Sequence, residues 1–299
     1  PARFCEPRLN ITDHSMEPLA NINGEQVPLA EAKVPALDRG FLFGDAVYEV
    51  LRVYDGKPWL EDDHFRRFER SLASVRITGV DVPRLRRRMH DTIRAGGFRE
   101  AIAYLQVTRG AAPRAHPFPA GATPLEFLYV AEFRDPYARA REEGGCVITH
   151  PDIRWGRCDV KSTNLLANVL AMQAAKEAGC VEAILTRPDG TLTEGTHTSF
   201  FGVLHGSVLT RPNSNAILPG ITRGLVLRLA ERAGVPVREQ VLKRDDLAEV
   251  SELFLTGTTS EVLPLVSVDG KPVGDGRPGP VTRRLQEAYR QAVREFVGG

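Results

Sequence analysis

Residues 158–166, CDVKSTNLL, and residues 192–201, LTEGTHTSFF, are the two stretches on which the interpretation of this chain depends. The first places Lys161 directly before apolar residues at helical spacing. The second places Glu194 between two segments of core character, Ile184–Leu185 and Phe200–Phe201. Partial desolvation makes a lysine amine a usable nucleophile, and a carboxylate in a core requires a cationic partner. Taken singly, Lys161 could be a surface lysine and TEGT a capped turn.

A third stretch, Leu218–Gly234 (LPGITRGLVLRLAERAG), sets a Pro-Gly turn directly before a predicted helix. The first amides of that helix, near Ile221 and Thr222, form a positive helix end that suits an anion. Thr258, in LTGTTSEV, offers a hydroxyl, and Arg67, in HFRRF, offers a fork-shaped cation. Each has a structural explanation as a cap, a turn or a surface arginine, but together they form a cradle for a dianion. A nucleophilic lysine, a buried carboxylate and such a cradle are what pyridoxal 5'-phosphate (PLP) requires.

The composition limits the classes of function. The chain has 299 residues, 42% hydrophobic and 26% charged, as in a globular protein of one large domain or two. Its net charge of +1 gives no reason to expect a nucleic acid or an anionic membrane as partner, and no apolar run approaches the length of a membrane span. The cysteines form no CxxC pair, so no metal and no disulfide framework are expected. The first ten residues lack the apolar region of a signal peptide, and we expect a cytoplasmic enzyme.

The first half of the chain predicts a sheet with two helices. Asp55-Gly56 is a hairpin signal within the aromatic and β-branched stretch 41–60. Asp62 or Asp63 is expected to cap a helix whose apolar residues, Phe65, Phe68, Leu72 and Val75, recur at helical spacing. A second helix is predicted over Pro83–Ala95, and its RLRRR run, 84–88, is expected to be a solvated face balanced by acids. Further strands are predicted over Ala101–Thr108 and Leu125–Phe133.

The second half mixes strands and helices. Strands are predicted over Cys146–His150, Ala183–Thr186, Ser199–Leu204 and Leu253–Thr256, and helices over Asn164–Ala178, Thr222–Ala233 and Val281–Phe296. This pattern favours an α+β enzyme of two domains. We expect an N-terminal extension at 1–18, an N-terminal α/β domain at 19–134, a linker at 135–142 and a C-terminal domain at 143–299.

The motifs FLFGDAVYEVLRVYDG, HFRRF, CDVKS-NLL, TEGT, LPGITR and TGTTSE occur in this order, and together they resemble the fold-type IV PLP enzymes. The resemblance runs from about Asn21 to the C-terminus. It implies a smaller N-terminal α/β domain and a larger C-terminal pseudo-barrel domain, with PLP between them. It also implies that Lys161 carries PLP covalently, that Glu194 faces the pyridine nitrogen, and that Leu218 packs on the ring. The phosphate would be held by Arg67, Ile221, Thr222 and Thr258.

Within this group, the stretch Thr108–Pro119, TRGAAPRAHPFP, resembles the substrate loop of D-amino acid aminotransferases. The resemblance implies that Arg114 and His116 bind the substrate carboxylate together with Tyr48. A guanidinium, an imidazole and a phenol suit a carboxylate. In that family the partner subunit supplies the loop, so a homodimer follows. We therefore predict transfer of the amino group of a D-amino acid, such as D-alanine, to a 2-oxo acid, such as pyruvate or 2-oxoglutarate.

Several alternatives stay open. On the same fold, a branched-chain L-amino acid aminotransferase or an (R)-selective amine transaminase is the closest competitor, followed by an aminodeoxychorismate lyase; the Arg114–His116 loop argues against all three. From another class, the RLRRR run could belong to a nucleic-acid-binding module, which the balanced net charge disfavours. Two positions depart from the family pattern. His197 stands where a serine is usual and is expected either near the cofactor or behind it, and Gly257 replaces a serine of the phosphate loop.

Overall fold

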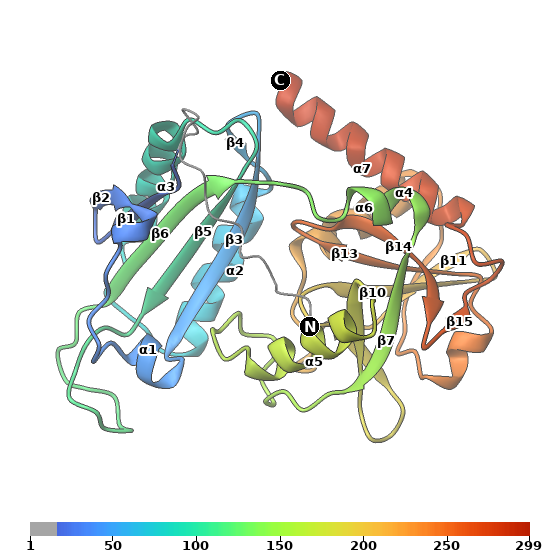
Figure 1. Ribbon diagram of the computed structural model, residues 1–299, viewed down its shortest axis with the longest axis horizontal. Helices are drawn as coiled ribbons and strands as arrows, with labels where there is room; N and C mark the ends of the chain where they lie inside the picture. The colour runs from blue at the N-terminus through green and yellow to red at the C-terminus, as the bar shows by residue number, and fades with distance from the viewer. Residues whose placement is uncertain (1–16) are drawn as a thin grey trace, which may run out of the picture.

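The computed structural model describes residues 17–299, so most of the predicted N-terminal extension lies outside the described residues. Two sheets lie side by side, each with its own helices (Figure 1). The six-stranded sheet belongs to the first half of the chain and the nine-stranded sheet to the second. This arrangement confirms the predicted α+β class and two-part fold. The residue bounds predicted for the domains stay a prediction.

The first sheet has the strand order β2-β1-β6-β5-β3-β4, and its neighbouring strands are antiparallel. Helices α2 and α3 pack against it, and their apolar residues share one core with β3, β5 and β6. The elements of this half are β1 (Leu19–Ile22), β2 (Glu25–Pro28), α1 (Arg39–Phe43), β3 (Ala46–Tyr54), β4 (Lys57–Pro58), α2 (Glu61–Ser74), α3 (Val82–Gly96), β5 (Ala101–Thr108) and β6 (Leu125–Glu132), with a 3-10 turn at Leu29–Glu31.

Local sequence explains most of this half. Asp55 and Gly56 both have positive φ and form the predicted turn between β3 and β4. Phe65, Phe68 and Leu72 face the core as predicted. The predicted cap of α2 is wrong: the helix begins after Leu60, which makes no side-chain capping bond. Asp62 and Asp63 lie instead inside its first turn, where their negative charges interact favourably with the positive helix end.

The RLRRR run lies on α3, and three of its four arginines pair with acids. Arg84 and Arg88 both bind Glu126, and Arg86 binds Glu61 at 2.7 Å and Asp62. The run is therefore a face balanced by acids from neighbouring elements, as predicted, rather than a free basic surface.

The second sheet has the order β12-β11-β10-β13-β14-β7-β8-β9, with β15 added to β14, and mixes parallel and antiparallel pairs. Helix α7 crosses this sheet and ends at the C-terminus (Figure 1). The elements are α4 (Ala138–Glu143), β7 (Gly145–Pro151), α5 (Leu166–Glu177), β8 (Glu182–Thr186), β9 (Leu192–Gly195), β10 (Ser199–Leu204), β11 (Ser207–Thr210), α6 (Ile221–Arg232), β12 (Val237–Glu239), β13 (Glu252–Gly257), β14 (Glu261–Val268), β15 (Lys271–Pro272) and α7 (Pro280–Gly298), with a 3-10 turn at Asp245–Ala248.

Helix α5 differs from an ordinary surface helix. The apolar face predicted from Leu165, Leu166, Val169 and Met172 is only partly packed on the chain: Leu165 and Met172 are half-buried, but Leu166 is 72% exposed and Val169 is 58% exposed. The helix instead rests on the sheet through its small residues, Ala171 and Ala175. An exposed apolar face of this kind marks a site of interaction.

The two halves contact each other through buried aromatic residues. The Trp59 indole donates a hydrogen bond of 3.1 Å to the Tyr289 hydroxyl on α7, and its ring also meets Phe296 at 4.9 Å. No helix in the part of the chain from residue 17 onward has both the length and the apolar character needed to cross a bilayer.

Candidate functional site

One cavity lies between the two halves of the chain and receives side chains from both. Its empty space is about 760 Å³, including the part open to solvent, which is within the range of small-molecule sites. The lining includes all of the predicted cofactor residues and one of the predicted substrate residues: Tyr48, Arg67, Lys161, Glu194, Leu218, Ile221, Thr222 and Thr258. We call this space the central cavity.

Lys161 lies in the segment between β7 and α5, which pairs with β3 of the other half. Its carbonyl accepts a hydrogen bond of 3.0 Å from the Tyr48 amide, and its own amide donates to the Ser71 hydroxyl at 3.2 Å. An isolated bridge between Val47 and Ser162 continues this pairing. The Lys161 ammonium lies 4.2 Å from the centre of the Tyr48 ring. Both backbone groups of Lys161 are thus held, and its amine is the only one among the lining residues.

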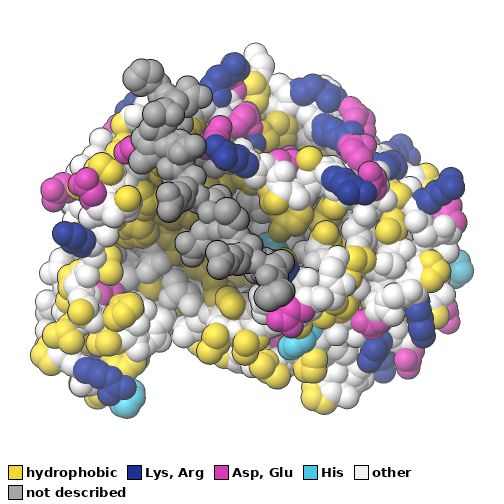
Figure 2. Space-filling model, viewed as in Figure 1, with side chains coloured by type: hydrophobic (Ala, Val, Ile, Leu, Met, Phe, Trp, Pro, Cys, Tyr) yellow, Lys and Arg dark blue, Asp and Glu magenta, His cyan; other side chains and the backbone are white. Residues whose placement is uncertain are grey.

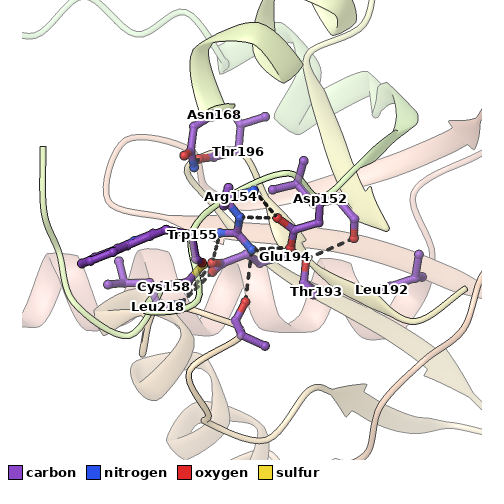
Figure 3. Close-up of polar contacts among 12 residues, drawn as sticks. Asp152, Arg154, Trp155, Cys158, Asn168, Leu192, Thr193, Glu194, Thr196 and Leu218 are labelled. Carbon is purple, nitrogen blue, oxygen red and sulfur yellow. Dashed lines mark hydrogen bonds and ion pairs between the residues drawn. The ribbon is translucent and has the colours of Figure 1, made fainter. Parts of the chain in front are cut away.

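Glu194 lies on β9 and is 5% exposed (Figure 3). Its Oε1 accepts a hydrogen bond of 2.5 Å from Arg154, and both of its carboxylate oxygens lie 3.1 Å from the Leu218 amide. The cationic partner that the sequence demanded is therefore present in the protein itself. Burial raises the pKa of Glu194 to about 7, although the charge and hydrogen bond of Arg154 oppose that shift.

Arg154 is a site residue that the sequence reasoning missed. Its Nε donates to Asp152 at 2.9 Å, and its Nη2 donates to Asp152 at 2.9 Å and to the Ala216 carbonyl at 3.1 Å (Figure 3). Burial works against its charge, but Asp152 and Glu194 raise the pKa of Arg154 overall. Asp152 and Arg154 stand two apart just after a core strand, so in an extended segment both side chains point the same way. That spacing was the signal available.

Arg67 lies on α2 and is held by a second buried carboxylate. Its Nε and Nη2 each donate to Glu49 at 2.7 Å, and Nη1 donates to the Pro219 carbonyl at 3.0 Å. His64 Nδ1 lies 2.7 Å from the same carboxylate. Although burial raises it, the pKa of Glu49 falls to about 2 because of Arg67 and His64. Arg67 therefore faces the central cavity with its fork already fixed, and only its remaining N–H groups are free for a phosphate.

The N-terminus of α6 opens on the central cavity. Gly220 precedes it and makes no side-chain capping bond, so the first amides, from Ile221 and Thr222, retain donor capacity. The hydroxyl of Thr256 also lines the cavity and, within the described residues, is buried without a hydrogen-bond partner. Uncapped amides and an unpaired hydroxyl beside a fixed arginine suit a phosphate. With Lys161 and Glu194 on the same walls, the residues present fit PLP.

The two departures from the family pattern have structural explanations. A Cβ on Gly257 would lie 2.6 Å from the buried Ser260 hydroxyl, so this position requires a shift before it can carry a side chain. His197 lies on the cavity rim, and its Nε2 shares a hydrogen bond of 3.0 Å with the Tyr137 hydroxyl. Its role toward a cofactor stays a prediction.

Arg114 and His116 are not brought to the central cavity of their own chain. Both are exposed and lie on the connection between β5 and β6, which projects away from the second sheet (Figure 1). Their side chains pack near Phe43 instead, with the Arg114 guanidinium 5.2 Å from that ring and the His116 ring 5.7 Å from it. Within residues 17–299, no cluster of His, Cys, Asp and Glu side chains is arranged to hold a metal ion.

Comparison with known proteins gives one family. The family model for amino-transferase class IV matches residues 46–268. The D-alanine aminotransferase of Bacillus licheniformis is 40% identical over 275 residues, covering 91% of this chain and 95% of the relative. That of Staphylococcus haemolyticus is 39% identical over 274 residues, covering 91% and 96%.

The similar solved structures include aminotransferases that are named for a different substrate, branched-chain amino acids. The branched-chain amino acid aminotransferase of Escherichia coli has a TM-score of 0.85 at 30% identity, covering 91% of this chain and 93% of that one. The T.th. branched-chain amino acid aminotransferase, solved with pyridoxamine 5'-phosphate, has a TM-score of 0.84 at 29% identity, covering 92% and 93%.

Proposed function

We propose a function from the premise that this chain belongs to the class IV aminotransferases, which use PLP. The proposed reaction moves the amino group of a D-amino acid, such as D-alanine, to a 2-oxo acid, such as pyruvate or 2-oxoglutarate. The observation that carries it is the meeting of Lys161, Glu194 and the free end of α6 in the central cavity of a chain similar to D-alanine aminotransferases. We also propose a reducing, cytoplasmic location, because Cys146, Cys158 and Cys180 are free thiols.

The residues of the central cavity have distinct roles in this proposal. When bound, PLP supplies an aldehyde that takes up the amino group and a ring that withdraws electrons from the substrate Cα. Lys161 would hold the cofactor, and its amine would move the proton at the substrate Cα. Glu194 presents a carboxylate to the ring nitrogen, with Arg154 and the Leu218 amide fixing its direction. Arg67, α6 and Thr258 bind the phosphate, and Leu218 packs on the ring.

Substrate recognition in this proposal needs a second copy of the chain. Tyr48 lines the central cavity, but Arg114 and His116 of the same chain do not. Several large apolar side chains are exposed, and Figure 2 shows hydrophobic side chains along the lower edge of the molecule. The most exposed are Val34, Leu37, Phe41, Phe118, Ile153, Trp155, Leu166, Val169 and Leu170. Covering this surface in a homodimer would place the 108–119 loop of each subunit at the cavity of the other.

Mixing two inactive variants tests the shared site. Lys161→Ala removes the amine but leaves the loop intact, and Arg114→Ala does the reverse. If the loop acts on the partner subunit, a mixed dimer contains one site with both wild-type residues, and activity toward D-alanine returns on co-expression. If the loop acts within its own chain, no mixed dimer has a complete site. Activity of the mixture no higher than that of the separate variants would refute a shared site.

The stereochemical part is tested on the purified holoenzyme. D-alanine is expected to convert the absorbance of bound PLP to that of the aminated cofactor, with L-alanine slower by at least about tenfold, or 1.4 kcal/mol. The competing candidate is a branched-chain L-amino acid aminotransferase, favoured by the similar solved structures. Faster conversion by L-leucine or L-valine than by D-alanine would replace the proposed function with this one.

A further inference from the structure

The 108–119 loop is ordered without a hydrophobic core of its own. Among the described residues, none from 108 to 124 belongs to a hydrophobic core cluster, and the same holds for residues 37–45, against which the loop packs. The backbone joins the two segments, because the Arg39 amide donates to the Gly110 carbonyl at 3.0 Å and the Ala112 amide donates to the Leu37 carbonyl at 3.3 Å. Apart from the Phe118 ring, which lies 3.6 Å from the Arg109 guanidinium, the contacts that hold the far end of the loop are polar.

Arg39, on the short helix α1, supplies these polar contacts. Its Nη1 donates to the Ala115 carbonyl at 2.6 Å, and its Nη2 donates to the His116 carbonyl at 3.3 Å; the Pro117 carbonyl lies 3.5 Å from Nη1. The guanidinium thus binds the backbone at and beside His116. Arg39 is 4% exposed although the loop residues that it binds are exposed. A fully desolvated arginine used in this way costs free energy, so its placement requires a compensating anion.

Asp45 is that anion, and it serves two arginines. Its Oδ2 accepts 2.8 Å hydrogen bonds from Arg39 Nε and from Arg109 Nε, and its Oδ1 accepts from Arg109 Nη2 at 3.0 Å. Although burial raises it, the pKa of Asp45 is lowered overall by Arg109 and Arg39. Arg109 also binds the Val75 and Arg76 carbonyls next to α2. Asp45 therefore links the loop, through two guanidinium groups, to the main body of the first half.

We call Arg39, Asp45 and Arg109 the arginine clamp. The Phe43 ring contacts both this clamp and the two loop side chains, Arg114 and His116. The Arg39 guanidinium is 4.8 Å from its ring centre and that of Arg114 is 5.2 Å, distances at which a cation is attracted to an aromatic face. The ring of His116 is 5.7 Å away. The arginine clamp thus holds the loop backbone, and Phe43 limits the directions in which the Arg114 and His116 side chains can point.

We propose that Arg39, anchored by Asp45 and acting through Phe43, is a positioning residue that sets substrate-carboxylate recognition by Arg114 and His116. This inference rests on the proposed function, in which the 108–119 loop binds the carboxylate. Arg39 touches neither substrate nor cofactor: it acts by keeping the loop in one conformation, so that binding does not have to order it. Its loss should weaken carboxylate recognition and leave the chemistry of the central cavity unchanged.

The test compares two amino donors in the holoenzyme. D-alanine has the carboxylate, and D-alaninol has a hydroxymethyl group in its place. Both half-reactions are followed in single turnover from the cofactor absorbance, so that a slow donor can still be measured. Arg39→Met is expected to raise the half-saturating concentration of D-alanine about tenfold or more, as for a misplaced charge-assisted pair, with a change below about twofold for D-alaninol.

Arg52→Met is the matched control. Arg52 is also buried, binds two carbonyls, of Val53 and Ala101, and pairs with Glu100, but it lies at the opposite end of β3. This variant is expected to have a lower melting temperature but an unchanged ratio of the half-saturating concentrations of D-alanine and D-alaninol. An equal ratio change in Arg52→Met and Arg39→Met, or an equal loss of both donors in Arg39→Met, would show a general structural role and overturn the inference.

A double-mutant cycle separates this inference from the proposed function. In an Arg114→Ala background, Arg39→Met should cause little further loss with D-alanine, because the group that it positions is gone. If Arg114→Ala weakens D-alanine and Arg39→Met alone does not, the inference fails and the proposed function stands. If Arg114→Ala itself has no effect, both fail. Should Arg39→Met not fold, Asp45→Asn, which keeps the side-chain size, takes its place with the same expected ratio change.

Discussion

Two buried glutamates hold or form parts of the site and differ in their titration: Glu194 lines the central cavity, and Glu49 lies behind Arg67, which lines it. Glu49 belongs to the first half of the chain and Glu194 to the second, and each pairs with a buried arginine. The pKa of Glu49 is lowered to about 2, whereas that of Glu194 is raised to about 7. Burial raises both pKa values, and the two glutamates differ in how far the charged groups beside them offset that effect. Glu49 receives two bonds from Arg67 and a third contact from His64, while Glu194 shares Arg154 with the competing carboxylate of Asp152.

The comparison indicates that a buried ion pair at the site can serve either structure or chemistry. A carboxylate saturated with donors is a fixed anchor, here for the arginine that faces the phosphate end of the cavity. A carboxylate with one shared cation keeps capacity for another positive group, which a ring nitrogen would provide. Burial raises the pKa of Glu194 to about 7, because Arg154 and the Leu218 amide offset the effect of burial only in part.

Removing the Glu49 carboxylate, which anchors Arg67, should give the largest change, a loss of unfolding free energy. Glu49→Gln leaves Arg67 buried with too few acceptors, and breaking a buried pair in this way costs about 3–5 kcal/mol of unfolding free energy. Urea unfolding of the variant and the wild type measures the loss. A stability change below about 1 kcal/mol would mean that Glu49 is not the anchor that the contacts indicate.

In the holoenzyme, removing the functional carboxylate should act mainly on the rate. In Glu194→Gln the amide cannot keep a ring nitrogen protonated, and we expect kcat to fall by about 10²–10³, the range for loss of one electrostatic contact to a transition state. The melting temperature should change less than in Glu49→Gln. Steady-state kinetics with near wild-type kcat would refute the assignment of Glu194.

The two carboxylates should also give opposite pH dependences in the cofactor-free protein. Glu49 has a lowered pKa, so its stabilisation is present above pH 4.5 and is lost as the pH falls toward 2. Glu194 has a raised pKa, so stability is lost as the pH rises from 4.5 to about 7. Each shift corresponds to roughly 3 kcal/mol.

Unfolding free energies measured across both pH windows test this pattern. Glu194→Gln should remove only the slope between pH 4.5 and 7, and Glu49→Gln only the slope below 4.5. If the slope between pH 4.5 and 7 persists in Glu194→Gln, or the slope below 4.5 persists in Glu49→Gln, that slope comes from the titration of another group.

The smallest change is expected from Asp152→Asn. The negative charge of Asp152 raises the pKa of Glu194 and competes for Arg154. The amide keeps an acceptor for Arg154 but removes this competition, so the proton on Glu194 should be lost at lower pH. We expect the stability slope assigned to Glu194 to move to lower pH by less than about one unit, or 1.4 kcal/mol. A shift to higher pH would contradict the sharing of Arg154.

The parts that could be predicted from sequence are those in which a residue acts together with its neighbours in the chain. Two such features could be recognised from adjacent residues alone: Lys161 before an apolar segment, and Pro219-Gly220 before a helix. Lys161 and Gly220 both line the central cavity. Arg154 could not be assigned to Glu194 in this way, because the pair forms only when β9 folds beside the segment that follows β7. The hairpin of β1 and β2 was missed although Asn23-Gly24 is a turn signal of the kind that identified Asp55-Gly56.

Helix α5 shows a different limit. Its apolar spacing predicts the helix correctly, but periodicity cannot say what covers the apolar face, and here Leu166 and Val169 are exposed. A pattern that would mean burial within one chain can equally mean burial against a second. The same holds for Arg114 and His116, whose spacing predicts a joint role but not the chain on which they act.

The pairing of β3 with the segment that holds Lys161 has a consequence for how the protein opens. Because the Tyr48 amide bonds to the Lys161 carbonyl and Val47 bridges to Ser162, the two halves cannot separate without breaking the support of the lysine. Local opening and loss of the reactive amine's position are then a single event, so the halves form one cooperative unit instead of two independent ones. Slow exchange of the Tyr48 amide with solvent deuterium would therefore report how long each molecule stays competent.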